Sequence, residues 1–224
     1  MRTRKTKRRF SKLRSKRGGE NSVTRKFNRL KGALNYGLKY NRKPKRLELA
    51  LSHSRTASSI ANNVWENEIV KVGEVGHKDE DHVVLNSTPE SLSQLRTAFG
   101  PASLVTAGNA SGVVDGAAAV VIKSASQAES DGDSPLARIV SWGIVGLDPA
   151  IMAYGPVPSS RLALEKAGLS IHDIDRWEIN EAFAGQAVAC IKDLGLDVQK
   201  VNVNGGAVGL GHPLAATGTR LVLT

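Results

Sequence analysis

The chain has 224 residues, a formal net charge of +10 and one cysteine. No apolar run approaches the roughly 18 residues that a membrane-spanning helix needs, and a single cysteine cannot form an internal disulfide. The charge is unevenly distributed, because residues 1–50 carry 19 Lys and Arg against 2 Asp and Glu, whereas residues 51–224 carry 12 against 19. The basic character therefore belongs to the N-terminal segment, and the remainder is long enough to bury one ordinary core.

Residues 1–46 form a basic leader that we predict to be disordered. The leader lacks an apolar core, which excludes a secretory signal. Three interpretations remain open: a transit peptide for an organelle, an arm for nucleic acid, nuclear import or a membrane surface, and a solvated tail without a function of its own. Few aromatic side chains are available for stacking on bases, namely Phe10, Phe27, Tyr36 and Tyr40.

Beyond the leader, the chain alternates between segments typical of helices and of strands. Helices are expected over 47–63, 89–96, 158–167, 181–194 and from Pro213 onward, and strands over 68–72, 82–85, 138–145, 177–179 and 200–203. Strands that alternate with helices indicate an α/β fold with a mostly parallel sheet covered on its faces. The Ser-, Asp- and Gly-rich stretch 125–135 is a plausible boundary between two halves.

Two junctions near the C-terminus attract attention, because each is expected to run from a strand end directly into a helix. Asn180 stands at the first and His212, between Gly211 and Pro213, at the second. A helix start offers unpaired N–H groups and the positive end of the macrodipole. An amide and a neutral imidazole at such points suit the binding of an oxyanion or the exchange of a proton. A helix N-cap for Asn180 and a capping or packing role for His212 also remain open.

The other reactive side chains have simpler interpretations. Glu181 could act as an acid or base, although a carboxylate in a first helical turn is also what the helix dipole favours. Cys190 lies on an apolar stripe of its expected helix and is predicted to be inert core. The remaining histidines have no metal-ligand spacing, so we expect no metal site. Small residues in the stretch 105–122 would let a ligand lie close to the backbone.

Four motifs in one order carry a family resemblance. They are Thr106-Ala107-Gly108-Asn109-Ala110-Ser111-Gly112, Gly155-Pro156-Val157-Pro158, Asn180-Glu181-Ala182-Phe183-Ala184, and Gly205-Gly206-Ala207 with Gly211-His212-Pro213. From about residue 50 to its end the chain resembles the thiolases, the family of acetyl-CoA acetyltransferases and 3-ketoacyl-CoA thiolases. The resemblance implies an incomplete layered α-β-α-β-α sandwich, with the end of the first lobe in residues 47–128 and a truncated second lobe in residues 129–224. It also implies homo-oligomers.

The resemblance implies an acyltransferase that acts on acyl-CoA thioesters through two cysteines and needs neither a metal nor another cofactor. His212 would help to activate the nucleophile and hydrogen-bond an oxyanion, and Asn180 would hold the water that completes that site. Ser111, Ala110 and Gly112 would lie along the pantetheine arm of CoA. The expected location is the cytoplasm, or the mitochondrion if the leader is a transit peptide.

Departures from the family pattern are equally informative. The nucleophilic cysteine of the family lies upstream of the segment that this chain resembles, and the motif with the second cysteine is expected after Thr224. Val114 and Ala215 replace the usual Asn and Gly. We therefore expect a fragment, a shortened gene product or a degenerate copy that cannot turn over alone and is poorly soluble. Two alternatives are a catalytically dead CoA-binding protein and a basic-arm binder with a thiolase-like passenger.

Overall fold

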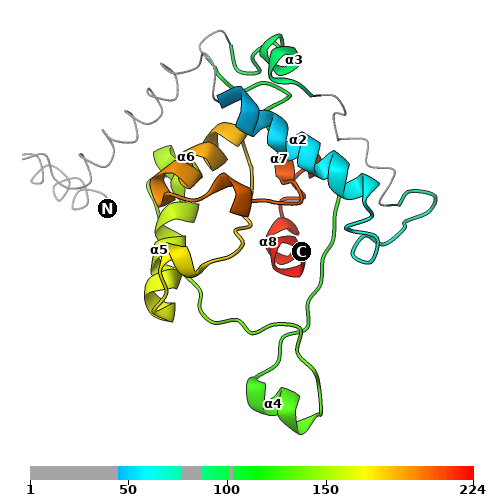
Figure 1. Ribbon diagram of the computed structural model, residues 1–224, viewed down its shortest axis with the longest axis vertical. Coiled ribbons are helices and arrows are strands. Elements are labelled where there is room, and N and C mark those ends of the chain that lie inside the picture. Colours follow the sequence, from blue (N-terminus) through cyan, green and yellow to red (C-terminus); the bar gives the residue numbers. More distant parts are fainter. Residues whose placement is uncertain (1–44, 77–86, 101–102) are drawn as a thin grey trace, which may run out of the picture. The chain divides into compact units, whose positions relative to one another are not determined.

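The computed structural model of the protein describes residues 45–76, 87–100 and 103–224. The predicted strand 82–85 lies outside these residues, as does the predicted leader except for its last two positions. The α-helices of the described part are α2 (Lys45–Ala61), α3 (Pro89–Ser93), α4 (Ala125–Ser130), α5 (Pro156–Ala167), α6 (Ala184–Leu194), α7 (Ala207–Leu210) and α8 (Thr217–Leu223) (Figure 1). Short 3-10 helices lie at Pro149–Tyr154, Ile171–Asp173 and Val198–Lys200.

The helices predicted over 47–63, 89–96 and 158–167 are confirmed as α2, α3 and α5, with shifted ends. Both α5 and α6 end where a glycine turns the chain, with φ of 67° at Gly168 and 69° at Gly195. Glycine adopts this left-handed conformation without steric cost, so these two ends were readable from local sequence.

A small apolar core joins α5 to α6. Val157 of α5 and Cys190 of α6 are fully buried, and Leu194 is nearly so. Partly buried apolar side chains surround them, namely Tyr154, Ile171, Trp177 and Leu196. The predicted inert role of Cys190 is consistent with this position, since burial also raises the pKa of the thiol.

A second contact brings α2 against α7 (Figure 1). Thr56 of α2 is completely buried, and its side chain occupies the space where a Cβ on Gly205 or Gly209 would lie. The absence of side chains at these two positions therefore permits the close approach of α2 to α7 and to the loop before it.

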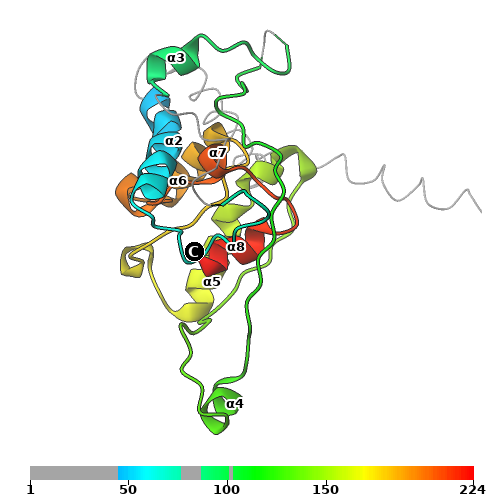
Figure 2. The same cartoon turned by 90° about the vertical axis from the view of Figure 1, so that its right-hand side faces the viewer.

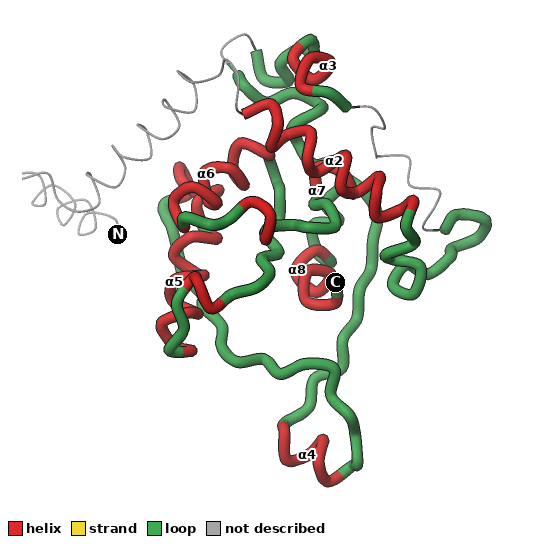
Figure 3. The backbone as a smooth tube through the Cα atoms, in the orientation of Figure 1, coloured by secondary structure: helices red, strands yellow, loops and turns green. Residues whose placement is uncertain are grey.

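Hydrogen-bonded strand ladders are absent from the described residues, as Figure 3 shows by its lack of strand colour. The predicted strands 177–179 and 200–203 meet in one parallel bridge, in which Trp177 N donates to Lys200 O (2.9 Å) and Asn202 N donates to Trp177 O (2.8 Å). The strand prediction for 68–72 is wrong. The segment follows a series of turns, and among the described residues its last residue, Val72, forms a bridge only with Val75, three residues later.

The strand prediction for 138–145 is also wrong. Residues 113–123 and 134–148 run as extended segments to and from α4 (Figures 1 and 2). Among the described residues no backbone hydrogen bond pairs either segment with another extended segment, so neither forms a strand despite its β-branched composition. The predicted α/β arrangement is thus present as helices connected by extended segments, with single bridges in place of a sheet among the described residues.

Candidate functional site

Asn180 and His212 lie in hydrogen-bonding contact, although 32 residues separate them in the sequence. The amide Nδ2 of Asn180 is 3.3 Å from the ring Nε2 of His212. Both side chains are partly buried, and the amide Oδ1 is buried without a hydrogen-bond partner among the described residues. The two predicted site residues are therefore brought together.

Thr217, at the start of α8, determines the orientation of the His212 ring. Its Oγ1 lies 2.7 Å from Nδ1 of His212 and donates its hydrogen to Pro213 O at 3.0 Å. Because that hydroxyl hydrogen is already used, we assign the proton in the shorter contact to Nδ1. The Nε2 lone pair then faces Asn180. The role of Thr217 was not predicted from the sequence. The pattern that could have indicated it is a hydroxyl side chain five residues after the histidine, within the expected helix.

The predicted helix starts at these two residues are wrong. Helix α6 begins at Ala184 with Phe183 as its N-cap, and α8 begins at Thr217. Neither Asn180 nor His212 is a helix cap, so the macrodipole argument does not apply to them as expected. The physical reason is tertiary, because residues 182–184 are held by the loop 109–111 and cannot start a helix earlier.

That loop and the residue after it, Gly112, contain the three predicted CoA-binding residues, and residues 109–112 are treated together as the loop. Ala110 forms an antiparallel bridge with Phe183, and Ser111 donates to Ala182 O through both N (3.2 Å) and Oγ (3.1 Å). Gly112 O accepts from the backbone N of His212 at 2.8 Å. The loop is thus joined to both segments that supply the Asn180–His212 pair.

Glu181, next to Asn180, is 8% exposed and has a role that local sequence did not reveal. Its carboxylate accepts hydrogen bonds from Ser52 Oγ (2.6 Å), Asn202 Nδ2 (2.9 Å) and Val208 N (3.1 Å). The expectation that it sits in the first turn of its own helix is wrong, since the N–H that it accepts belongs to α7. Ser52 and Asn202 were also missed, because their partners are distant in sequence.

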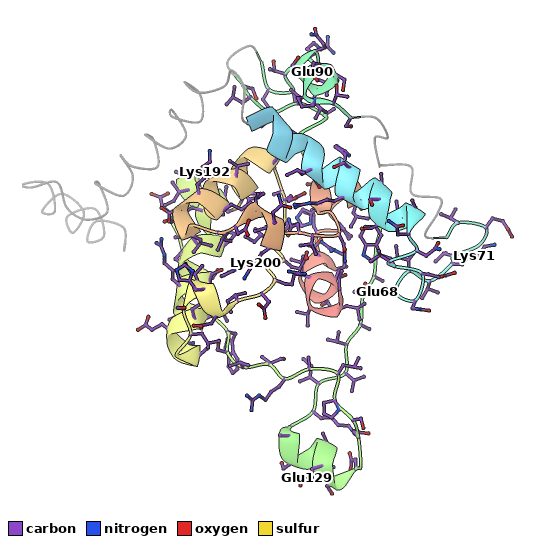
Figure 4. The ribbon with its side chains drawn as sticks, viewed as in Figure 1. Glu68, Lys71, Glu90, Glu129, Lys192 and Lys200 are labelled. Atoms are coloured by element: carbon purple, nitrogen blue, oxygen red, sulfur yellow. The ribbon has the colours of Figure 1, made fainter. Side chains whose placement is uncertain are left out.

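Two further ionisable groups flank the site. Burial raises the pKa of Glu178, and the nearby positive charge of Arg220 opposes that rise. Burial lowers the pKa of Arg220, while Glu178, Glu181 and Glu68 oppose the change. Among the charged side chains labelled in Figure 4, Lys192 on α6 and Glu129 on α4 are exposed instead.

Within the described ranges, no group of three or more His, Cys, Asp or Glu could hold a metal ion. The same ranges contain no helix whose length and apolar character would let it cross a bilayer.

The thiolase N-terminal domain model matches residues 42–126, and the thiolase C-terminal domain model matches residues 133–224. A 3-ketoacyl-CoA thiolase of Citrobacter koseri is 49% identical over 189 residues, covering 78% of this chain and 48% of that protein. An acetyl-CoA acetyltransferase of Escherichia coli is 50% identical over 184 residues, and the match covers 79% of this chain and 47% of that protein. The chain thus spans about half the length of the curated relatives it matches.

Solved structures agree with these matches. The acetyl-CoA acetyltransferase of Bacillus anthracis is similar with a TM-score of 0.75 at 40% identity, covering 85% of this chain and 50% of that one. A human mitochondrial 3-ketoacyl-CoA thiolase in complex with CoA gives a TM-score of 0.71 at 36% identity, and the match covers 85% of this chain and 49% of that one. The chain belongs to the thiolase family, as a partial chain with an incomplete thiolase-like α/β fold.

Proposed function

We propose that this chain supplies the Asn180–His212 part of a thiolase-type site, which transfers acyl groups between CoA thioesters. The observation that carries the proposal is the 3.3 Å contact of Asn180 with His212, beside a loop of small residues that is bonded to both segments. The names of the relatives support the reaction class, as acetyl-CoA acetyltransferases and 3-ketoacyl-CoA thiolases.

In the proposed reaction His212 acts first as a base. Its Nε2 lone pair accepts the proton of a cysteine thiol, and the thiolate attacks the carbonyl carbon of an acyl-CoA. As the new C–S bond forms, the carbonyl π electrons move to oxygen, and Nε2–H donates a hydrogen bond to that oxyanion. When the carbonyl re-forms, the bond to the CoA sulfur breaks and CoA leaves as its thiolate. Asn180 holds the water that gives the oxyanion its second donor.

The reacting cysteine is not Cys190. That side chain is fully buried between α5 and α6, where its thiol donates to Ala153 O at 3.6 Å. Since the chain has no other cysteine, we propose that it does not complete the reaction alone. This observation also favours a second candidate function, the binding of CoA or acyl-CoA without turnover.

Binding of CoA is proposed at the loop of Ala110, Ser111 and Gly112. Small side chains there let the pantetheine arm approach the backbone, and a related thiolase has been solved in complex with CoA. A cytoplasmic location and self-association into homo-oligomers belong to the same proposal.

Calorimetric titration with CoA and acetyl-CoA tests the proposal. We expect both to bind, and we expect His212→Asn to weaken acetyl-CoA binding roughly tenfold while CoA binding changes little. Loss of the ring frees Asn180 from its partner and displaces the water that it holds for the thioester oxygen, a group that CoA lacks. His172→Asn, on an exposed 3-10 helix, is the matched control. A folded chain that binds neither compound refutes the proposal, and steady acetoacetyl-CoA cleavage by the chain alone refutes the assignment of Cys190 as inert.

A further inference from the structure

The carboxylate of Glu181 connects the two segments that carry Asn180 and His212. Glu181 follows Asn180 directly, and its Oε2 accepts from the backbone N of Val208 in α7 at 3.1 Å. Helix α7 ends at Leu210, and Gly211 leads from it to His212. A single buried side chain therefore joins the neighbour of the amide to the helix that precedes the imidazole.

Ser52 of α2 completes this connection from a third element. Its Oγ donates to Glu181 Oε2 at 2.6 Å and accepts from Gly206 N (3.2 Å) and Gly209 N (3.1 Å). The hydroxyl of Ser52 therefore donates its one hydrogen and accepts with both lone pairs of its oxygen. Ser52 and Glu181 together hold the backbone of α7 and the residue before it. The space is closely filled, since a Cβ on Gly206 would collide with the Glu181 carboxylate.

Asn202 holds the other side of Asn180. Its Nδ2 donates to Ile179 O (2.8 Å) and to Glu181 Oε1 (2.9 Å), and its Oδ1 accepts from Ile179 N (2.8 Å). The residues immediately before and after Asn180 are therefore both fixed by buried hydrogen bonds. Asn180 has little freedom to move away from His212 while these bonds last.

We propose that Glu181 is a positioning residue, whose buried carboxylate sets the distance between Asn180 and His212. The inference rests on the proposed function of that pair. A carboxylate suits the position because it only accepts hydrogen bonds, and three donors from three elements converge on it. A glutamine there would turn an NH₂ group toward at least one of these donors, which leaves buried polar groups unpaired and shifts the segments.

The sharpest experiment reads the His212 ring in the full chain by long-range ¹H–¹⁵N NMR, with its signals assigned through loss in His212→Asn. In the unsubstituted chain we expect the Nδ1–H tautomer. In Glu181→Gln we expect the Nε2 signal to shift and the two tautomers to mix, and acetyl-CoA binding to weaken roughly tenfold with CoA binding unchanged. Glu178→Gln is the matched control, because it removes a carboxyl from the same segment that accepts no hydrogen bond from Ser52, Asn202 or α7.

Rescue separates positioning from general stability. The conservative variant Glu181→Asp keeps a carboxylate that only accepts hydrogen bonds, so its His212 signals should lie closer to those of the unsubstituted chain than the signals of Glu181→Gln do. If Glu181→Gln does not fold, Ser52→Ala removes one of the three donors and should produce the same ring shift in a smaller degree. Ring signals in folded Glu181→Gln or Ser52→Ala that match Glu178→Gln overturn the inference. Failure of acetyl-CoA to bind the unsubstituted chain refutes the proposed function instead, and the ring signals still test the positioning.

Discussion

Thr217 Oγ1 lies 2.7 Å from Nδ1 of His212, and this contact decides which ring nitrogen faces Asn180. The hydroxyl donates to Pro213 O, so the imidazole presents Nδ1–H to it and keeps the Nε2 lone pair for the site. A base that must take a proton at Nε2 needs this tautomer.

Thr217→Val should release the ring from the single tautomer, because valine keeps the shape but cannot accept from Nδ1–H. We expect mixed tautomers by ¹⁵N NMR and acetyl-CoA binding weaker by about three- to tenfold, the effect of one hydrogen bond. Thr219→Val, in the same helix α8, should change neither quantity. Identical ring signals in the two variants would show that the hydroxyl does not select the tautomer.

Gly206→Ala should destabilise the chain, because the added Cβ meets the buried carboxylate of Glu181. Overpacking of this kind costs about 1–3 kcal/mol. Gly185→Ala is the matched control on α6, where an added Cβ meets nothing within 4 Å and alanine favours the helix by about 0.5–1 kcal/mol. Thermal melts should therefore shift in opposite directions for the two variants, and a shift in the same direction would contradict the close contact.

Cys190 should resist thiol reagents at neutral pH until the chain unfolds, because it is fully buried and burial raises its pKa above the ordinary value of 9.0. The folded state holds the thiol proton more tightly than the unfolded state. Below pH 9.0 both states keep that proton; as the pH rises beyond it, the unfolded thiol ionises first and folding stability falls. Cys190→Ala should lose this part of the alkaline destabilisation in pH-dependent melts. Rapid labelling of the folded chain would contradict the assignment.

The extended segments 113–123 and 134–148 should make the chain associate. They expose large apolar side chains, among them Val121 at 90% and Ile144 at 85%, and among the described residues no backbone hydrogen bond pairs them with another extended segment. Unpaired extended backbone with apolar side chains favours pairing between chains. Light scattering after size exclusion should show oligomers that decrease in Val121→Lys with Ile144→Lys. A monodisperse monomer of the unsubstituted chain would refute this.

Local signals in the sequence were sufficient for several features of the fold. The ends of α5 and α6 follow from Gly168 and Gly195, since a left-handed residue after a helix is nearly always glycine or asparagine. The burial of Cys190 follows from its place on an apolar stripe. The strand predictions for 68–72 and 138–145 are wrong because a segment of high β-propensity forms a strand only where a neighbouring backbone pairs with it, and local composition does not determine whether one is there.

The motifs singled out Asn180 and His212 as candidates, and the structure brings the two side chains into contact, but the way in which they meet was not readable from the sequence. The sequence placed Asn180 and His212 at helix starts, yet α6 begins at Ala184 and α8 at Thr217. Hydrogen bonds from the loop 109–111 and from Ser52 delay the first helix and turn Glu181 inward. Contacts between residues more than 70 positions apart outweigh a first-turn preference worth only about 0.3–1 kcal/mol, and no local pattern encodes them.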